Sequence, residues 1–206
     1  MELTAAEPRR KSLIQLYLDG EQGPKIDREV FLLSRLRPGD QLTEEELQEL
    51  VERSDARRAK EKALYLLEHR SHSKRELTEK IARTAASREA AQAAVDHLEE
   101  IGLVDDRAFG ETYARELFQR KGYGSRRVRQ ELLRKGISGD LLEELLDRFG
   151  SQEDAGENIR RVLEKRYPLW KEDEKVRRRA LAALQRLGYG YEEIRSALGD
   201  LEQEME

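Results

Sequence analysis

The stretch GSRRVRQELLRKGIS, residues 124–138, predicts a short basic helix that ends near Gly136. Four arginines and a lysine lie in it, although the whole chain has a formal net charge of -4. Glycine adopts the left-handed conformation that closes a helix without strain. The stretch RRRALAALQRLGYG, residues 177–190, repeats the pattern. A basic helix followed by a glycine stop is therefore a unit that this chain uses more than once.

The two copies align at an offset of 52 residues, and an acidic amphipathic helix follows each of them. The coinciding pairs include Arg126 with Arg178, Arg127 with Arg179, Leu132 with Leu184, Arg134 with Arg186 and Gly136 with Gly188. A weaker first copy is SKRELTEKIART, followed by SREAAQAAVDHLEEIG. Another helix precedes each copy, so the pattern predicts three units of three helices. Because one such unit buries little surface alone, we expect neighbouring units to stack.

The N-terminal region has a different pattern. RKSLIQLYL (10–18) is rich in β-branched, aromatic and leucine residues and ends at Asp19-Gly20, a turn signal. A second apolar run, REVFLLSRL (28–36), ends at a Pro-Gly turn. These runs predict the two strands of a small β-hairpin, and we expect no strand after Gly39.

Local helix signals then divide the rest of the chain. Thr43 and Glu46 form a predicted capping box, and Ser73 with Glu76 repeats it. Further predicted N-caps are Ser87, Asp105 or Asp106, Ser125, Ser138 and Ser151, and the predicted stops are Gly102, Gly122, Gly136, Gly150 and Gly188. The expected fold is mainly α: three tandem three-helix units in an elongated array, preceded by a small β-hairpin and a linking helix. The expected regions are 1–42 (hairpin), 43–104 (linking helix and first unit), 105–150 (second unit) and 151–206 (third unit).

The composition excludes several classes of protein. The 206 residues include no cysteine, 40% are charged and 37% are hydrophobic. No apolar run approaches the roughly 18 residues that a membrane span needs, and the start lacks the apolar core of a signal peptide. We expect a monomer in the cytoplasm, without disulfides and without contact with a membrane.

Positive charge gathers on the second helix of each unit, whereas the third helices (138–149 and 190–206) are acidic. If the units stack in register, the second helices form a basic ridge with an acidic flank, suited to an anionic partner. The predicted ridge residues are Lys74, Arg75, Arg126, Arg127, Arg129, Lys135, Arg177, Arg178 and Arg179. The alternative is that these cations pair with acidic neighbours on solvated helix faces, as charge runs usually do.

Signs of catalysis and of metal binding are weak. No GxxxxGK[ST] motif is present, and His69 and His72 lack cysteine or a third matched ligand for zinc. Asp105-Asp106 stands directly before a predicted helix, which favours N-capping over acid/base chemistry. The sequence predicts no catalytic residue, no cofactor and no metal, and therefore not an enzyme.

Glycine and aromatic residues recur near the predicted helix ends. Gly122-Tyr123-Gly124 and Gly188-Tyr189-Gly190 are not equivalent in the repeat, and both are interpreted as turns. Helical spacing places Phe109, Tyr113 and Phe118 in the core. Residues Tyr123, Tyr167 and Trp170 either stack on a base or a partner, or anchor the loops against the core.

At IGLVDDRAFGETYARE, residues 101–116, the chain resembles the RecX family of bacterial regulators of the RecA recombinase. The likeness rests on Gly102, Leu103, the two aspartates and Phe109, and on the turn at Gly136-Ile137. It extends over nearly the whole chain and is best from about residue 60 to 150. The Tyr167–Trp170 connection in the third unit departs from the family pattern.

The resemblance implies an elongated helical molecule that lodges in the groove of the RecA–DNA filament. There it would reduce ATP hydrolysis, strand exchange and coprotease activity. The alternative function is direct binding of single- or double-stranded DNA, because three-helix units with a basic helix are similar to helix-turn-helix modules.

Overall fold

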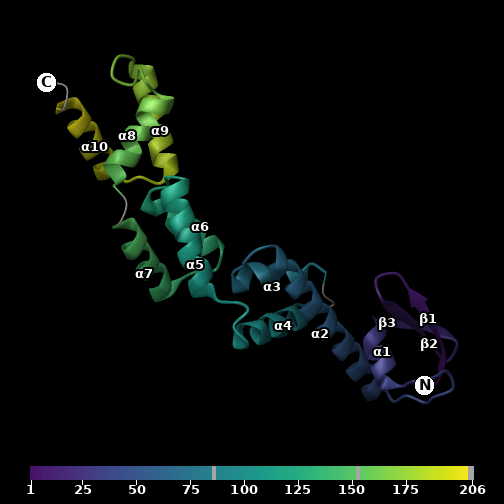
Figure 1. The fold of residues 1–206 in the computed structure, drawn as a ribbon. Helices are drawn as coiled ribbons and strands as arrows, with labels where there is room; N and C mark the ends of the chain where they lie inside the picture. Colours follow the sequence, from purple (N-terminus) through teal and green to yellow (C-terminus); the bar gives the residue numbers. More distant parts are fainter. Residues whose placement is uncertain (85–86, 152–153, 204–206) are drawn as a thin grey trace. The chain divides into compact units, whose positions relative to one another are not determined.

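The computed structural model describes residues 1–84, 87–151 and 154–203. Two compact units divide the chain, Met1–Val104 and Asp105–Glu206. The described residues are mostly helical, with one small antiparallel sheet near the N-terminus (Figure 1). The expected fold class, helical units preceded by a small β region and a linking helix, is confirmed.

The N-terminal sheet contains three strands rather than two. They are β1 (Leu3–Arg9), β2 (Leu13–Leu18) and β3 (Glu21–Asp27), paired antiparallel in the order β1-β2-β3. Leu18 pairs with Glu21 across the turn at Asp19-Gly20, where φ is +49° and +84°. Positive φ at both central residues is typical of the tight hairpin turn that matches strand twist. The predicted turn is therefore confirmed, and β2 lies within the predicted strand 10–18.

The predicted strand at 28–36 is wrong, because most of this run is the helix α1 (Arg28–Ser34). The Asp27 carboxylate accepts hydrogen bonds from the backbone N–H groups of Glu29 and Val30, which starts the helix. Arg35 adopts a left-handed conformation and ends it. The two strands that flank β2 are β1, which contains Pro8, and β3, which contains Pro24. These prolines made the sequence pattern of both segments less typical of a strand. Both strands lie at the edges of the sheet, where proline is tolerated.

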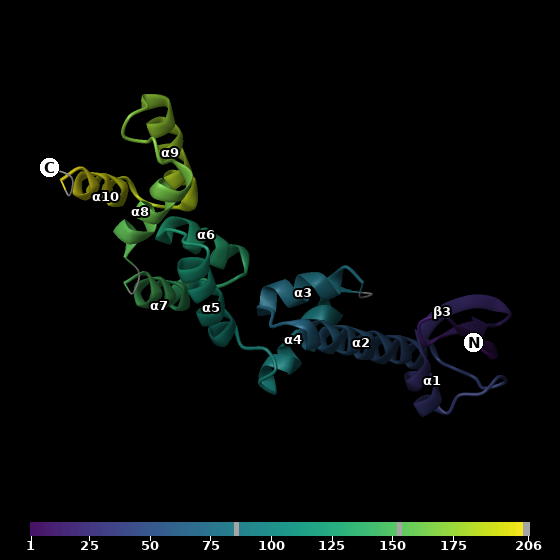
Figure 2. The same ribbon diagram turned by 45° about the horizontal axis from the view of Figure 1, so that its top comes forward.

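The first unit is built around one long helix, α2 (Glu44–His69). The Thr43 hydroxyl accepts from the Glu46 N–H at 3.1 Å and the Glu46 carboxylate accepts from the Thr43 N–H at 2.8 Å, so the predicted capping box is confirmed. No glycine or proline interrupts α2, which passes without a break from the predicted linking helix into the first three-helix unit. The other helices of this unit are α3 (Lys74–Ala82) and α4 (Arg88–Glu100). The sheet and α1 lie against the N-terminal half of α2, and α3 and α4 against its C-terminal half (Figures 1 and 2).

The second unit contains two groups of three helices, each with its own core. The first group is α5 (Asp106–Arg115) with its π-helical continuation η1 (Glu116–Arg120), α6 (Ser125–Arg134) and α7 (Gly139–Gly150). The second group is α8 (Ala155–Arg166), α9 (Glu174–Leu187) and α10 (Tyr191–Gln203). Phe109 and Phe118 are buried in the first core, as predicted. Trp170 is buried in the second core, so it anchors its loop rather than offering a stacking face.

Most predicted helix ends agree with the structure. Ser73, Ser87 and Asp105 each accept a hydrogen bond from the first turn of the helix that follows. The predicted stops at Gly102, Gly122, Gly136 and Gly188 all have positive φ. Two N-caps were wrong: Gly124 rather than Ser125 precedes α6, and Asp154 rather than Ser151 caps α8, because Ser151 ends α7. None of the helices in the described part of the chain is long and apolar enough to cross a bilayer.

Candidate partner and nucleic-acid interface

The basic helices α9 and α6 meet end to end inside the second unit. The Gly124 N–H donates to the Leu187 carbonyl at 2.8 Å, and the Arg126 N–H donates to the Gly188 carbonyl at 3.3 Å. A helix leaves its first N–H groups and its last carbonyls without partners. Here the C-terminal carbonyls of α9 serve the N-terminal N–H groups of α6, and opposite ends of two helix dipoles face each other. The junction therefore fixes the position of the basic residues of α6 relative to those of α9.

Two Gly-Tyr-Gly motifs form this junction. A Cβ atom on Gly124 would lie 2.5 Å from the carbonyl carbon of Gly188, so the two backbones touch where neither has a side chain. The Tyr189 hydroxyl donates to the Gly122 carbonyl at 2.9 Å. The sequence predicted both motifs as turns but missed their contact. The repetition of the tripeptide was the available signal, because glycine often marks a close approach of two backbones.

Arg127, a predicted ridge residue, holds the junction together. Its guanidinium lies 3.9 Å from the ring centroid of Tyr123 and donates to the Arg186 carbonyl at 3.1 Å. A salt bridge of 3.8 Å joins it to Glu131. The Arg127 side chain is half-buried, and these three contacts engage its guanidinium within the protein. Its role is therefore structural. Tyr123 likewise lies under this arginine rather than presenting a free face.

Arg126 and Arg129 line a groove of about 540 Å³ between α6 and α7. Arg129 makes two hydrogen bonds to the Glu143 carboxylate, one of 2.6 Å. This pairing lowers the pKa of Glu143 and raises that of Arg129. Arg126 is exposed and has no salt bridge or side-chain hydrogen bond within the described part of the chain. Only Arg126 of these two therefore keeps its charge open to a partner.

The remaining ridge residues of the second unit also differ in whether their side chains contact other groups of the protein. Lys135 follows α6, with its ammonium 5.7 Å from the centroid of the Tyr113 ring. On α9, Arg178 pairs with Glu174 at 3.1 Å and Arg177 is half-buried. Arg179 is exposed and forms no salt bridge or side-chain hydrogen bond among the described residues.

The ridge residues of the first unit are neutralised within the unit. The Lys74 ammonium lies 2.8 Å from Asp96 and 2.5 Å from Glu99, both on α4. Hydrogen bonds to these two carboxylates raise the pKa of Lys74 above its ordinary value. Arg75 pairs with Glu79 one turn along α3. For Lys74 and Arg75, the geometry therefore agrees with the alternative interpretation, in which basic residues pair with acidic neighbours on solvated helix faces.

Part of the predicted acidic flank is neutralised as well. Glu143 pairs with Arg129, and Glu144 pairs with Arg107 of α5 at 2.5 Å. The hydrogen bond from Arg107 lowers the pKa of Glu144. Glu204 and Glu206, which belong to the predicted flank on the last helix, lie outside the described residues.

The other candidate positions have structural roles. The Asp105 carboxylate accepts from the N–H groups of Arg107 and Ala108, so the N-capping interpretation of this residue is confirmed. His72 is buried, with Nδ1 3.2 Å from the Glu76 carboxylate. Among the residues that the structure describes, no cluster of three His, Cys, Asp or Glu side chains is placed to hold a metal ion.

Comparison with known proteins identifies the family of the chain. Residues 105–146 match the model "RecX, second three-helix domain" and residues 152–198 match "RecX, third three-helix domain". A protein named "Regulatory protein RecX" from Chlorobium phaeobacteroides is 31% identical over 149 residues, covering 72% of this chain and 96% of that protein. The chain belongs to the RecX family.

Other RecX relatives extend the match. A protein of the same name from Stenotrophomonas maltophilia is 37% identical over 139 residues, 66% of this chain and 83% of its own length. The one from Caldanaerobacter subterraneus is 28% identical over 189 residues, 92% of this chain and 93% of its own length. A solved structure titled "Crystal structure of RecX from Lactobacillus salivarius" shares the fold, with a TM-score of 0.62, 19% identity and coverage of 72% and 97% of the two chains. The relatives are named as regulatory proteins, which makes this RecX chain a regulator by family.

Proposed function

We propose that this protein regulates the RecA recombinase, mainly negatively, by binding the RecA–DNA filament. Bound there, it reduces ATP hydrolysis, strand exchange and coprotease activity. Membership of a family of regulatory proteins supports a regulatory function. In this proposal the protein works as a monomer in the cytoplasm, without a cofactor, a metal or a catalytic activity of its own.

The observation that carries the proposal is the pair of open arginines on two joined basic helices. Arg126 on α6 and Arg179 on α9 have no salt-bridge partner among the described residues, and the glycine junction connects their helices end to end. Cations held at a set spacing suit a partner with regularly repeated negative charge. Each phosphate that they neutralise would release counterions, so binding should weaken as salt rises.

The first test measures single-stranded-DNA-dependent ATP hydrolysis by RecA while this protein is added well below the RecA concentration. We expect the rate to fall at that low ratio, because a bound regulator would block growth of the filament. A rate that stays flat up to equimolar protein contradicts the proposal.

The second test assigns the interface. The double variant Arg126→Glu/Arg179→Glu should lose most of the inhibition. The matched control is Arg166→Glu/Arg195→Glu, which makes the same change of charge at exposed arginines of α8 and α10. Equal inhibition by the two double variants would remove Arg126 and Arg179 from the interface.

Direct DNA binding is the second candidate function, because the same open arginines could contact phosphates of a duplex. A gel shift on duplex DNA in the absence of RecA separates the two. Tight, sequence-dependent binding there, with no effect on RecA hydrolysis, would favour this alternative.

A further inference from the structure

The groove between α6 and α7, about 540 Å³ in volume, combines exposed apolar surface with an open cation. Leu133 is 42% exposed in it, and Leu146 of α7 is a buried residue of its wall. The other lining residues are polar or charged: Ser125, Arg126, Arg129, Gln130 and Asp147. A single exposed leucine is common on protein surfaces. A leucine in a groove beside an open arginine is the combination found at protein–protein interfaces, where apolar side chains and arginine gather.

The α6 side of the groove is the face of the helix that does not pack in the core. Arg126, Gln130 and Leu133 follow one another at four- and three-residue spacings, which place them on one face. Val128 and Leu132 lie on the opposite face and are fully buried. Leu133 is not part of that core, so its side chain is available to a partner.

The charges of the groove favour a partner with few negative groups. Arg129 is paired with Glu143, which leaves Arg126 as the open cation of the lining among the described residues. Asp147 lies close enough to Arg129 for their charges to interact. A nucleic-acid strand carries a phosphate on every nucleotide, and phosphates along this groove would meet the Asp147 carboxylate and the leucine. A protein segment with one carboxylate near Arg126 avoids both costs.

The distance between the open arginine and the exposed leucine selects a helix as the partner segment. Seven residues separate Arg126 from Leu133, which is about 10 Å along the axis of α6. A second helix lying along the groove spans that distance with two side chains seven residues apart, and these share one face. An extended segment spans it in about three residues, but side chains three apart in a strand point to opposite faces. The groove therefore fits an amphipathic helix that carries an apolar residue and a carboxylate seven residues apart.

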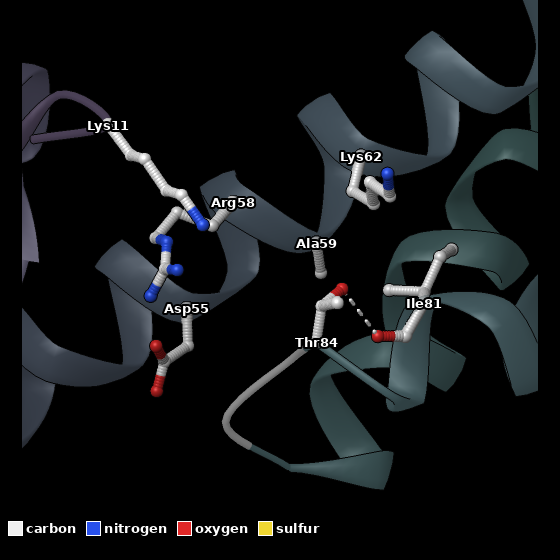
Figure 3. Close-up of a pocket in the computed structure, with 7 residues that line it drawn as sticks. All are labelled: Lys11, Asp55, Arg58, Ala59, Lys62, Ile81 and Thr84. Carbon is white, nitrogen blue, oxygen red and sulfur yellow. Dashed lines mark hydrogen bonds between the residues drawn. The ribbon is translucent and has the colours of Figure 1, made fainter.

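A hollow in the first unit provides the contrast (Figure 3). It holds about 260 Å³, and Lys11, Arg58 and Lys62 are among its lining residues. Its apolar lining residues, Ala59 and Ile81, are both buried. Of these two sites, only the groove between α6 and α7 offers an exposed apolar side chain to a protein.

We propose that the groove between α6 and α7 binds an amphipathic helix of RecA, with a carboxylate on Arg126 and an apolar side chain against Leu133 and Leu146. The assignment rests on the proposed function, because it takes the partner to be the protein of the RecA–DNA filament. The phosphates of the DNA are then left to Arg179 on α9. Burial of the apolar side chain contributes affinity that salt does not screen.

A photo-crosslinker identifies what lies in the groove. p-Benzoylphenylalanine replaces Leu133 in the full chain, which is added to RecA filaments on single-stranded DNA and irradiated. We expect an adduct with RecA, and peptide mapping should place it on a helix. The same crosslinker at Leu169, an exposed leucine in the α8–α9 loop outside the groove, should give no such adduct. A crosslinker at Gln130 covers the case in which the larger group at 133 prevents binding.

Truncation of the leucine measures the apolar contact. Leu133→Ala should weaken binding to RecA filaments on immobilised oligo(dT) about tenfold. The slope of log affinity against log salt should stay the same, because the leucine contacts no phosphate. Leu133→Met should bind normally, since it keeps the volume of the side chain. Leu169→Ala is the matched control and should bind as the unchanged chain does.

The groove is not the site of a RecA helix if the adduct forms with DNA or between two copies of this chain. Inhibition without an adduct from either 133 or 130 would contradict the assignment as well. Wild-type affinity of Leu133→Ala, or equal losses in Leu133→Ala and Leu169→Ala, would also overturn it. Failure of the RecA proposal looks different, because the unchanged chain would then leave ATP hydrolysis flat and bind no filament.

Discussion

Lys74 on α3 and Arg126 on α6 occupy similar places, each near the start of the basic second helix of a three-helix unit. Their surroundings differ. Asp96 and Glu99 of the next helix take up the charge of Lys74, whereas Arg126 has no such partner among the described residues. On α7 the comparable carboxylate, Glu143, is directed to Arg129. A basic residue in a repeat is thus available to a partner only when no carboxylate of its own helix or of the following helix reaches it, since Arg75 is paired with Glu79 of its own helix.

The largest expected effect comes from breaking the junction that positions α6. In Gly188→Ala the new Cβ would lie 2.4 Å from the Arg127 backbone nitrogen, at a residue with φ of +96°. We expect a loss of about 3 kcal/mol in the free energy of unfolding of the second unit, from backbone strain and from the clash. Urea denaturation followed by circular dichroism measures it.

Gly139→Ala is the matched control for that loss. Gly139 also has positive φ, +61°, but no atom lies within 4 Å of the position of a Cβ. It should lose only the strain, about 1 to 2 kcal/mol. Equal losses in the two variants would mean that the close approach of Gly124 and Gly188 contributes nothing.

A smaller effect should distinguish Lys74 from Arg126 directly. Lys74→Ala removes two ion pairs between α3 and α4, so the first unit should lose up to about 1 kcal/mol of stability, with the loss shrinking in high salt. Arg126→Ala removes no salt bridge and should leave stability unchanged. A stability loss in Arg126→Ala that matches Lys74→Ala would show that Arg126 is neutralised within the protein too.

The smallest effect is a difference between the units in acid. Burial lowers the pKa of His72 below 6.5, although the hydrogen bond with Glu76 opposes this, and the nearby cations Arg70 and Lys80 act with burial. The unfolded chain then takes up the proton first, so the first unit should lose stability as the pH falls below about 6.5.

In the second unit, the pKa of Glu143 is lowered from 4.5 by Arg129, so the stability from that pair is present above pH 4.5 and is lost below it. Chemical denaturation should be measured at a series of pH values between 7 and 4. As the pH is lowered, the first unit should begin to lose stability at a higher pH than the second unit does. His72→Gln should remove the difference near pH 6, and a pH profile that does not change in this variant would contradict the assignment.

Much of the fold could be predicted because helix ends depend on local chemistry. Thr43 with Glu46, and glycines such as Gly136, act within a few residues and are legible in the sequence. The run at 28–36 was mispredicted because its apolar residues suit a strand or a helix equally well. The Asp27 cap and the pairing of β3 with β2 decided between them. Edge strands that contain proline lack the alternation that would have marked them.

The sequence by itself determined the three-helix repeat, the ends of most helices and which helices are basic, because these depend on neighbouring residues. Only the tertiary structure decided which cations are neutralised, since Lys74 and Glu99 are 25 residues apart. It also brought Tyr189 to Gly122, 67 residues away, and Lys11 to the face of α2. Contacts across such separations depend on how whole helices pack, and a local pattern carries no record of that packing.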